Sequence, residues 1–183
     1  MYDLVPLHAA DPREVARFLA NNRERFRPYS PTRSDHYFTR EHWRAACRLA
    51  RTEWRDDKAY RFCIELKREA VIGKIDLDRV ARGPFQAATL GYMLDRLHEG
   101  RSVMRRALAD VLRLAFEEFD LHRVEAAIMP DNTRSRALAE RLGFREIGLS
   151  RAYLKLDGHW RDHVLYEISA GDLTHPSGLR MRR

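Results

Sequence analysis

A glycine-containing turn that leads into a helix is the clearest candidate for chemistry in this sequence. The apolar run Leu90 to Leu94 predicts a strand, and a long amphipathic helix begins near Ser102, shortly after Gly100. Backbone N–H groups at the start of a helix lie at the positive end of the helix dipole and can hold a phosphate. Gly100 lacks the side chain that would keep an anion away. We therefore expect an anion site over Leu97 to Val103.

Polar residues also lie at the start of a later helix. Asn132 follows the apolar run Val124 to Met129, and Ser135 lies in the first turn of that helix. An Asn at this place often serves only as a cap, because its side chain accepts a hydrogen bond from a backbone N–H group. A Ser in the first turn can also bond the backbone. Both residues can face a ligand instead, and for Asn132 the two roles can coexist.

The elements that position these residues follow from hydrophobic periodicity and turn residues. Asp11 and Pro12 have the types expected at an N-cap and a first helical position, and Gly143 marks a helix end. In chain order the sequence predicts strand Asp3 to Leu7, a helix from Asp11, a helix capped by Thr39, strands Arg61 to Leu66, Val71 to Leu77 and Phe85 to Leu94, a helix from Ser102 to about Phe119, strand Val124 to Met129, a helix from Asn132 to Gly143, and strands Phe144 to Leu156 and Trp160 to Ile168.

This order, β-α-α-β-β-β-α-β-α-β-β, predicts an α/β fold with a mixed (α+β) sheet and helices on both faces. The helix from Ser102 should connect two adjacent parallel strands through a crossover. The segment from Asn21 to Thr39 is rich in Arg, Pro and aromatic residues. It is too irregular for a helix and predicts an ordered loop over a site. Polar turns at Lys67 to Glu69 and at Asp157-Gly158 should join antiparallel strands.

Length and composition fit one globular domain. With 183 residues and 44% apolar content, we expect one domain over residues 1–170 and a flexible basic tail over residues 171–183. Cys47 and Cys63 lack metal-ligand or redox spacing and should be reduced core residues. No segment has the length and apolarity to cross a bilayer, and the start does not read as a signal peptide, so we expect a cytoplasmic protein without a membrane partner.

The net charge of +7 predicts a surface that attracts anions. Such a surface fits a nucleotide cofactor, RNA or an acidic partner, and charge alone does not choose between them. The aromatic residues mostly fall at core periodicity and are not interleaved with basic residues on one surface. We therefore expect no sequence-specific binding of nucleic acid.

Several motifs in register resemble those of one enzyme family. With the predicted element order, the turn His98 to Ser102, Asn132-x-x-Ser135 and Leu142-Gly143-Phe144 make the chain similar to GNAT-superfamily N-acetyltransferases. Further runs resemble the ribosomal-protein-alanine N-acetyltransferases of the RimJ/RimL type, and the likeness covers nearly the whole chain. These runs are Gly73-Lys-Ile, Phe85-Gln86, Leu90-Gly91-Tyr92, Leu121-His122-Arg123-Val124-Glu125-Ala126 and Tyr153-Leu154-x-x-Asp157-Gly158-x-Trp160-Arg161-Asp162-His163.

The resemblance implies a GNAT acyl-CoA N-acyltransferase fold, acetyl-CoA as co-substrate and no metal. The diphosphate of the cofactor would lie on the N–H groups of the turn, helped by the charge of Arg101. The pantetheine arm would pair with the end of the preceding strand like an extra strand. The implied cofactor-binding residues are Met93, Leu94, His98, Gly100, Arg101, Ser102, Val103 and Asn132.

The chain departs from the family pattern at three places. The Tyr that often protonates the thiolate is replaced by Ala139, so Ser135 is our candidate for a hydrogen bond to the departing sulfur. The Glu that RimL-like enzymes use as base aligns to Leu154. The second Gly of the phosphate turn aligns to Ser102, where a small hydroxyl residue can still fit.

The general base stays open. An α-amine has a pKa of about 8, against about 10.4 for lysine, so a modest base acting through a water suffices. Asp76, Glu65 and Asp162 are candidates, and we take Asp76 first, although the more usual role of such a residue is a sheet-surface or paired carboxylate. His98 and His163 are similarly ambiguous.

The acceptor should enter between the loop Phe26 to Phe38 and the hairpin Tyr153 to Trp160. Tyr29, Tyr153 and Trp160 can line this entrance, and their bulk favours a short N-terminal segment. Core packing explains Trp160 equally well.

The function that the resemblance implies is acetyl-CoA-dependent N-acetylation of a protein N-terminal α-amine. A ribosomal protein or the ribosome is the implied partner. A small-molecule amine or a lysine is the alternative acceptor, because sequence does not separate these cases. A non-enzymatic alternative is a basic module that binds ribosomes or RNA. The absence of the family's Tyr and Glu motivates this alternative. The sequence leaves the oligomeric state open.

Overall fold

The computed structural model describes residues 2–67 and 70–172. Its strands form a seven-stranded mixed sheet in the order β1-β2-β3-β4-β5-β7-β6. The strands are β1 Tyr2–Pro6, β2 Tyr60–Leu66, β3 Ala70–Ala81, β4 Ala87–Leu94, β5 Arg123–Ile128, β6 Arg145–Leu156 and β7 His159–Ser169. The pair β4 and β5 is parallel and the other neighbouring pairs are antiparallel.

Polar caps fix where two of the longer helices begin. The Asp11 carboxylate accepts a hydrogen bond from the Arg13 N–H group at 2.8 Å, and Thr39 Oγ1 accepts one from the His42 N–H group at 3.3 Å. Each cap satisfies an N–H group that has no partner within its helix. Both caps agree with the sequence prediction. The helices are α1 Pro12–Asn21, α2 Arg23–Phe26, α3 Arg40–Arg55, α4 Val103–Glu117 and α5 Thr133–Arg141.

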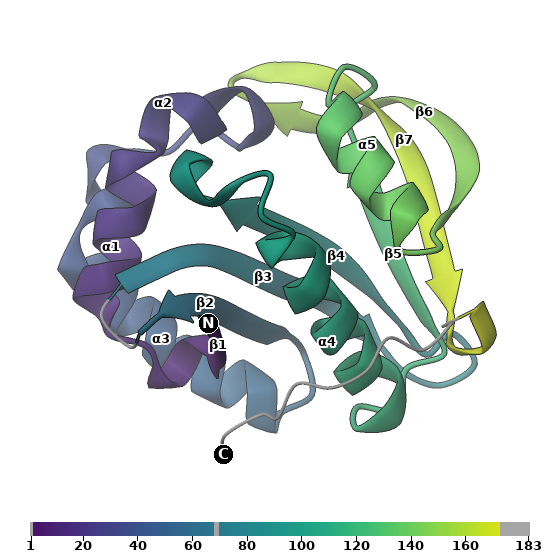
Figure 1. Cartoon of the computed structure of the whole chain (residues 1–183), viewed down its shortest axis with the longest axis horizontal. Helices are drawn as coiled ribbons and strands as arrows, with labels where there is room; N and C mark the ends of the chain where they lie inside the picture. Colours follow the sequence, from purple (N-terminus) through teal and green to yellow (C-terminus); the bar gives the residue numbers. More distant parts are fainter. Residues whose placement is uncertain (1, 68–69, 173–183) are drawn as a thin grey trace.

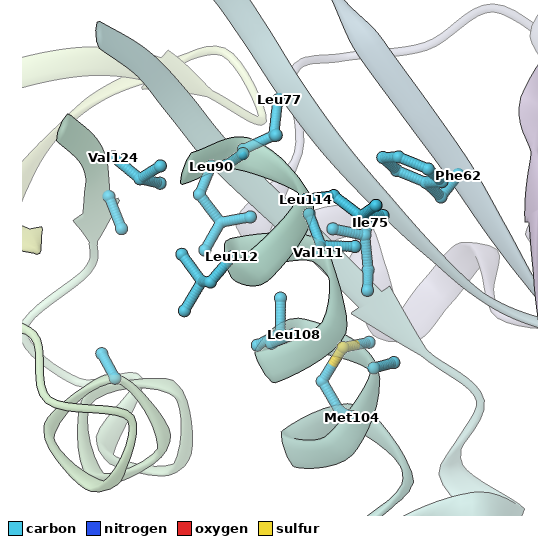
Figure 2. Packing of buried hydrophobic residues seen from close by; sticks show 14 of the residues in the cluster. Phe62, Ile75, Leu77, Leu90, Met104, Leu108, Val111, Leu112, Leu114 and Val124 are labelled. Carbon is cyan, nitrogen blue, oxygen red and sulfur yellow. The ribbon is translucent and has the colours of Figure 1, made fainter. Parts of the chain in front are cut away.

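The larger apolar layer lies between the sheet and α4. In Figure 1, α4 and α5 lie in front of the sheet and α3 lies behind it. Ile75 and Leu77 of β3 pack in one buried cluster with Leu108 and Val111 of α4 (Figure 2). The crossover helix α4 thereby holds β4 and β5 as parallel neighbours, as predicted. Over the described ranges, no helix has the length and apolarity required to span a membrane.

A second apolar cluster covers the other face. Phe18 of α1 and Trp43 of α3 are buried there with Cys63 of β2. Cys47 and Cys63 are both free and buried, as the sequence predicts. Alternate residues of one strand point to opposite faces, so both faces of the central strands are covered. The predicted α/β class with a mixed sheet and helices on both faces is confirmed.

Strands β4 and β5 separate before either strand ends. Their parallel pairing runs from Ala87 opposite Arg123 to Leu90 opposite Ala126. β4 then continues to Leu94 beside β3, and β5 continues to Ile128 beside β7. Over Gly91 to Leu94, the edge of β4 that faces β5 therefore has no strand partner among the described residues. An unpaired edge of this kind can accept another extended segment.

The structure differs from the prediction over Asn21 to Thr39. This segment contains α2 and two 3₁₀ turns, Arg27–Tyr29 and Asp35–Phe38. None of these three elements contains a buried residue, so no apolar periodicity marks them in the sequence. The expectation that the segment is too irregular for a helix is therefore wrong.

Other predictions differ at their boundaries. β3 continues past Leu77 to Ala81. The predicted turn at residues 67–69 lies outside the described residues beyond Lys67. The predicted tail lies outside them as well, apart from residues 171–172, which belong to the 3₁₀ turn Ala170–Asp172. The single-domain assignment stays a prediction.

Gly73 on β3 is a crowded position beside the end of β4. A Cβ atom added there would lie 2.9 Å from Ile64 Cδ1 and 3.0 Å from Met93 O. We predict that Gly73→Ala lowers the free energy of unfolding by about 1–3 kcal/mol, because the methyl group overpacks this contact. Gly91→Ala is the matched control, since a Cβ atom there meets nothing within 4 Å. Urea denaturation should show a change below about 0.5 kcal/mol for the control; equal losses in both variants would contradict this packing.

Candidate functional site

A cavity of about 840 Å³ lies beside the unpaired end of β4. Its size is typical of a site for a small molecule or cofactor. The wall is formed by α2 and the 3₁₀ turn after it, the end of β4, the turn before α4 and the beginnings of α4 and α5. The lining residues are Glu24, Arg25, Phe26, Pro28, Tyr29, Tyr92, Met93, Leu94, His98, Glu99, Gly100, Ser102, Val103, Met104, Arg105, Asn132, Arg134, Ser135, Leu138 and Arg141.

The turn before α4 leaves backbone N–H groups available. Gly100 has a φ of +71° and Ser102 a φ of +56°, both in the left-handed region. Ser102 precedes α4, and its side chain makes no capping hydrogen bond. The N–H groups of the first turn of α4 are therefore not satisfied by this residue. A Cβ atom on Gly100 would meet nothing within 4 Å, so there is open space beside the turn.

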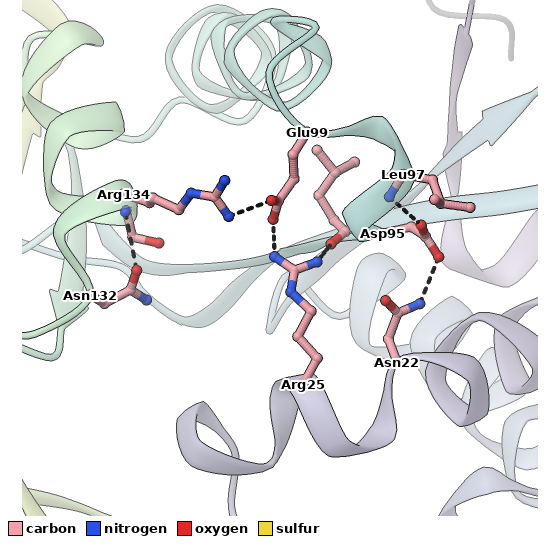
Figure 3. Close-up of polar contacts among 9 residues, drawn as sticks. Asn22, Arg25, Asp95, Leu97, Glu99, Asn132 and Arg134 are labelled. Atoms are coloured by element: carbon pink, nitrogen blue, oxygen red, sulfur yellow. Dashed lines mark hydrogen bonds and ion pairs between the residues drawn. The ribbon is translucent and has the colours of Figure 1, made fainter.

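The first part of the turn is held from outside. Asp95 accepts a hydrogen bond from the Leu97 N–H group at 2.8 Å and another from Asn22 Nδ2 at 2.8 Å (Figure 3). Asn22 is buried and also donates to Phe18 O at 2.9 Å. These bonds connect the end of α1 to the turn. Hydrogen bonds to the end of α1 thus fix the start of the turn at Asp95.

The start of α5 forms the opposite wall. Asn132 Oδ1 accepts a hydrogen bond from the Ser135 N–H group at 3.2 Å, so Asn132 is a helix cap that also lines the cavity. Tyr92 of β4 donates from its hydroxyl to Ser135 O at 3.2 Å. Burial raises the pKa of Tyr92 to about 12, so this hydroxyl is protonated at neutral pH. The bond joins β4 to α5 beside the point where β4 and β5 separate.

Most of the predicted cofactor-binding residues line this cavity. The residues that do so are Met93, Leu94, His98, Gly100, Ser102, Val103 and Asn132, together with Ser135 and Tyr29 from the other predicted sets. Arg101 does not line it, and its carbonyl accepts from Arg106 Nη2 at 3.5 Å. The structure therefore brings the predicted turn, strand end and helix start together at one place.

Asp76 does not line the cavity. It forms an ion pair with Lys74 of the same strand, on the face opposite to Ile75 and Leu77. Burial raises the pKa of Asp76, and the charge of Asp78 acts in the same direction, while Lys74 opposes the shift. Lys74 is itself buried, with its Nζ 5.7 Å from the centre of the Trp43 ring.

The hairpin residues also lie away from the cavity lining. The Trp160 side chain is 64% exposed, and the Tyr153 ring packs against His163 with 5.6 Å between ring centres. Asp162 accepts a hydrogen bond from the Ala152 N–H group at 2.8 Å, which gives this carboxylate a structural partner. The hairpin does touch the segment after α2, because the Asp157 N–H group donates to Ser30 O at 3.0 Å.

Seven lining residues with polar side chains were not among the predicted site residues: Glu24, Arg25, Tyr92, Glu99, Arg105, Arg134 and Arg141. Tyr92 lies within the Leu90-Gly91-Tyr92 motif, and this motif could have indicated that Tyr92 belongs to the site. Arg25 lies in the segment predicted as irregular, Glu99 directly precedes Gly100, and Arg134 lies within Asn132-x-x-Ser135. Sequence periodicity gives no indication of which charged side chains point into a cavity. In residues 2–67 and 70–172, no group of three or more His, Cys, Asp or Glu is placed to hold a metal ion.

Comparisons with known proteins find similarity to acetyltransferases. The family described as "Acetyltransferase (GNAT) domain" matches residues 2–145. "Probable N-acetyltransferase YjcK" of Bacillus subtilis (strain 168) is 35% identical over 164 residues, which are 89% of this chain and 91% of the relative. The [Ribosomal protein uS5]-alanine N-acetyltransferase of Escherichia coli (strain K12) is 32% identical over 169 residues, which are 92% of this chain and 87% of the relative.

Solved structures show the same fold. The ribosomal-protein-S5-alanine acetyltransferase from Vibrio fischeri superposes with a TM-score of 0.87 at 29% identity, covering 95% of this chain and 94% of that one. Mycobacterium smegmatis RimJ in complex with CoA-disulfide superposes with a TM-score of 0.85 at 30% identity, covering 94% and 88%.

Proposed function

This chain belongs to the acetyltransferase (GNAT) family and is an N-acetyltransferase, and from that premise we propose acetyl-CoA as its donor and the N-terminal α-amine of a ribosomal protein as its acceptor. The observation that carries the proposal is the unpaired edge of β4 beside the cavity. The arm of a thioester cofactor can lie along such an edge. Relatives named for alanine acetylation of uS5 or S5 support the acceptor.

The residues of the cavity fit acetyl-CoA, which supplies an acetyl group activated as a thioester. Gly100, Ser102 and Val103 would hold the diphosphate on backbone N–H groups at the start of α4. Backbone groups of Met93 and Leu94 would pair with the arm and orient the acetyl carbonyl. His98 also lines the cavity, and Arg101 would add positive charge from outside it.

Ser135 is our candidate for donating a hydrogen bond to the departing sulfur. It lines the cavity at the first turn of α5, and its backbone is held on both sides by Asn132 and Tyr92. Two fixed hydrogen bonds limit the movement of this residue, and a positioned donor stabilises charge better than a mobile one. Asn132 would combine its capping role with a contact to the arm.

Asp76 remains our proposed base, acting through a water. Its raised pKa makes it a better proton acceptor than an ordinary aspartate. Asp76 lies opposite Gly91 of β4 in the sheet register, and a Cβ atom on Gly91 would meet nothing within 4 Å. There is thus open space over the neighbouring backbone through which a water could connect Asp76 to an amine.

An α-amine suits this arrangement better than a lysine does. Its pKa of about 8 means that roughly a tenth of the amine is deprotonated at pH 7, whereas for lysine, with a pKa of about 10.4, the deprotonated fraction is below about a thousandth, so lysine needs a stronger base. Tyr29, which is 45% exposed at the cavity, would contact the acceptor, with Tyr153 and Trp160 as outer contacts on the hairpin. Ribosomes lie in the cytoplasm, where we place the protein. A small-molecule amine or a lysine is the alternative acceptor.

We predict that free thiol is released from acetyl-CoA with peptides that have a free N-terminal amine. The panel should also contain lysine peptides with blocked N-termini and small amines. Reaction of the blocked lysine peptides or small amines alone would contradict the α-amine proposal. A chain that binds acetyl-CoA but releases no thiol with any amine would favour the non-catalytic alternative.

We predict that Gly100→Val weakens CoA binding by about tenfold or more, because the side chain would occupy the space beside the turn. Gly83→Val is the matched control. Gly83 has a similar φ of +68° and equally open surroundings, and it does not line the cavity. Isothermal titration should show CoA affinity reduced in the first variant and unchanged in the second. Equal affinities in both variants would reject the phosphate role of the turn.

We predict that Ser135→Ala lowers kcat by about tenfold to a hundredfold, with CoA affinity within about twofold of wild type. Thr133→Ala is the control, because Thr133 also has a hydroxyl in the first turn of α5 and does not line the cavity. Steady-state thiol release measures kcat in both variants. An unchanged kcat for Ser135→Ala would remove this residue from the catalytic site.

A further inference from the structure

The carboxylate of Glu99 lies between two arginines that come from distant parts of the chain. It forms one ion pair with Arg25 of α2 and another with Arg134 of α5 (Figure 3). All three side chains line the cavity. Together they connect α2, the turn before α4 and the start of α5 across the site.

The two arginines are held differently. Arg25 donates from Nη1 to Leu94 O at 3.0 Å, so its guanidinium group is fixed at the end of β4 while Nη2 reaches Glu99. Arg134 is 75% exposed, compared with 32% for Arg25 and 19% for Glu99. An exposed ion pair contributes little stability, so Arg134 can exchange its partner at small cost.

Glu99 has an unusual position for a residue of an anion-binding turn. It directly precedes Gly100, and it is sheltered from solvent. A carboxylate in such a place repels a neighbouring phosphate, because the interaction between charges is less screened there than in water. The two arginines neutralise this charge. They are also the type of group that binds phosphate best, through paired N–H donors.

We propose that Arg25 and Arg134 bind the diphosphate of the cofactor with their side chains, in addition to the backbone N–H groups of the turn. Glu99 competes with the diphosphate for these two arginines. The inference rests on the proposed function, because the ligand is the diphosphate of CoA. On binding, the diphosphate takes over one or both guanidinium groups and the Glu99 carboxylate moves away from them. The competition weakens the hold on CoA and thereby helps CoA to leave after acetyl transfer.

The test is the affinity of Glu99→Gln for CoA, measured by isothermal titration. Gln has nearly the same size and removes the competing charge. We expect CoA to bind about fivefold tighter or more. Glu24→Gln is the matched control, because Glu24 also lines the cavity but pairs with Arg27 at 3.1 Å, outside the cluster. The control gives the same change in net charge, and its CoA affinity should stay within about twofold of wild type.

Truncated ligands identify the group that is bound. Dephospho-CoA keeps the diphosphate and lacks the 3′-phosphate, so Glu99→Gln should bind it more tightly by the same factor. Pantetheine lacks both groups and should show no gain. Arg134→Gln should weaken binding of CoA and dephospho-CoA but not of pantetheine, and the loss should be larger in the Glu99→Gln background, where Arg134 has no competing partner.

Thermal melting shows whether each variant is folded. If Glu99→Gln fails to fold, the Arg134→Gln measurements decide, since Arg134 is exposed and its loss buries no unpaired charge. Equal CoA affinity of folded Glu99→Gln and wild type would overturn the inference, as would a gain for CoA that is absent for dephospho-CoA. Failure of the wild-type chain to bind CoA would contradict the proposed function, and this inference with it.

Discussion

Strands β4 and β5 share hydrogen bonds from Ala87 to Leu90 and from Arg123 to Ala126, and then separate. Buried N–H and C=O groups need partners, so an unpaired strand end inside a sheet is costly unless something else bonds to it. Here Arg25 bonds to Leu94 O, and the rest of the β4 end faces a cavity. The missing strand pairing is therefore the feature that makes room for a ligand in the middle of the sheet.

The elements around this opening fix its chemistry. The crossover helix α4 must begin just beyond the end of β4, which places its N-terminus and the turn with Gly100 at the same opening. The start of α5 follows β5 and forms the opposite wall, with Ser135 tied to β4 through Tyr92. Topology alone thus brings together the turn that we propose binds phosphate, an unpaired strand edge and Ser135, the proposed hydroxyl donor. In our proposal the side chains then determine the affinity for the diphosphate. Arg25 and Arg134 raise this affinity and Glu99 lowers it.

The fold could be predicted from the sequence because its determinants are local. The caps at Asp11 and Thr39 and the buried stripe of α4 mark element starts and faces without tertiary information. The short helix α2 could not be predicted, since no buried residue marks it. In the site, the turn before α4 and the end of β4 could be predicted from the strand order and from the position of Gly100.

The charged part of the site did not follow from the sequence. The cluster of Arg25, Glu99 and Arg134 joins residues far apart in sequence, and no spacing rule connects them. The pairing of Asp76 with Lys74, next to each other on one strand face, could have been expected from a period of two. That Asp76 lies away from the cavity could not be predicted, because the sequence does not show where on the sheet the cavity forms.

Amide hydrogen exchange of β4, measured by NMR with and without saturating CoA, reports directly on whether the arm of CoA pairs with this edge. If the arm of CoA pairs with the unpaired edge, at least one amide between Gly91 and Leu94 should exchange more slowly by about tenfold or more, while Ala87 to Leu90, which already pair with β5, should change little. Binding of CoA that leaves every amide from Gly91 to Leu94 unchanged would show that the arm does not pair with this edge.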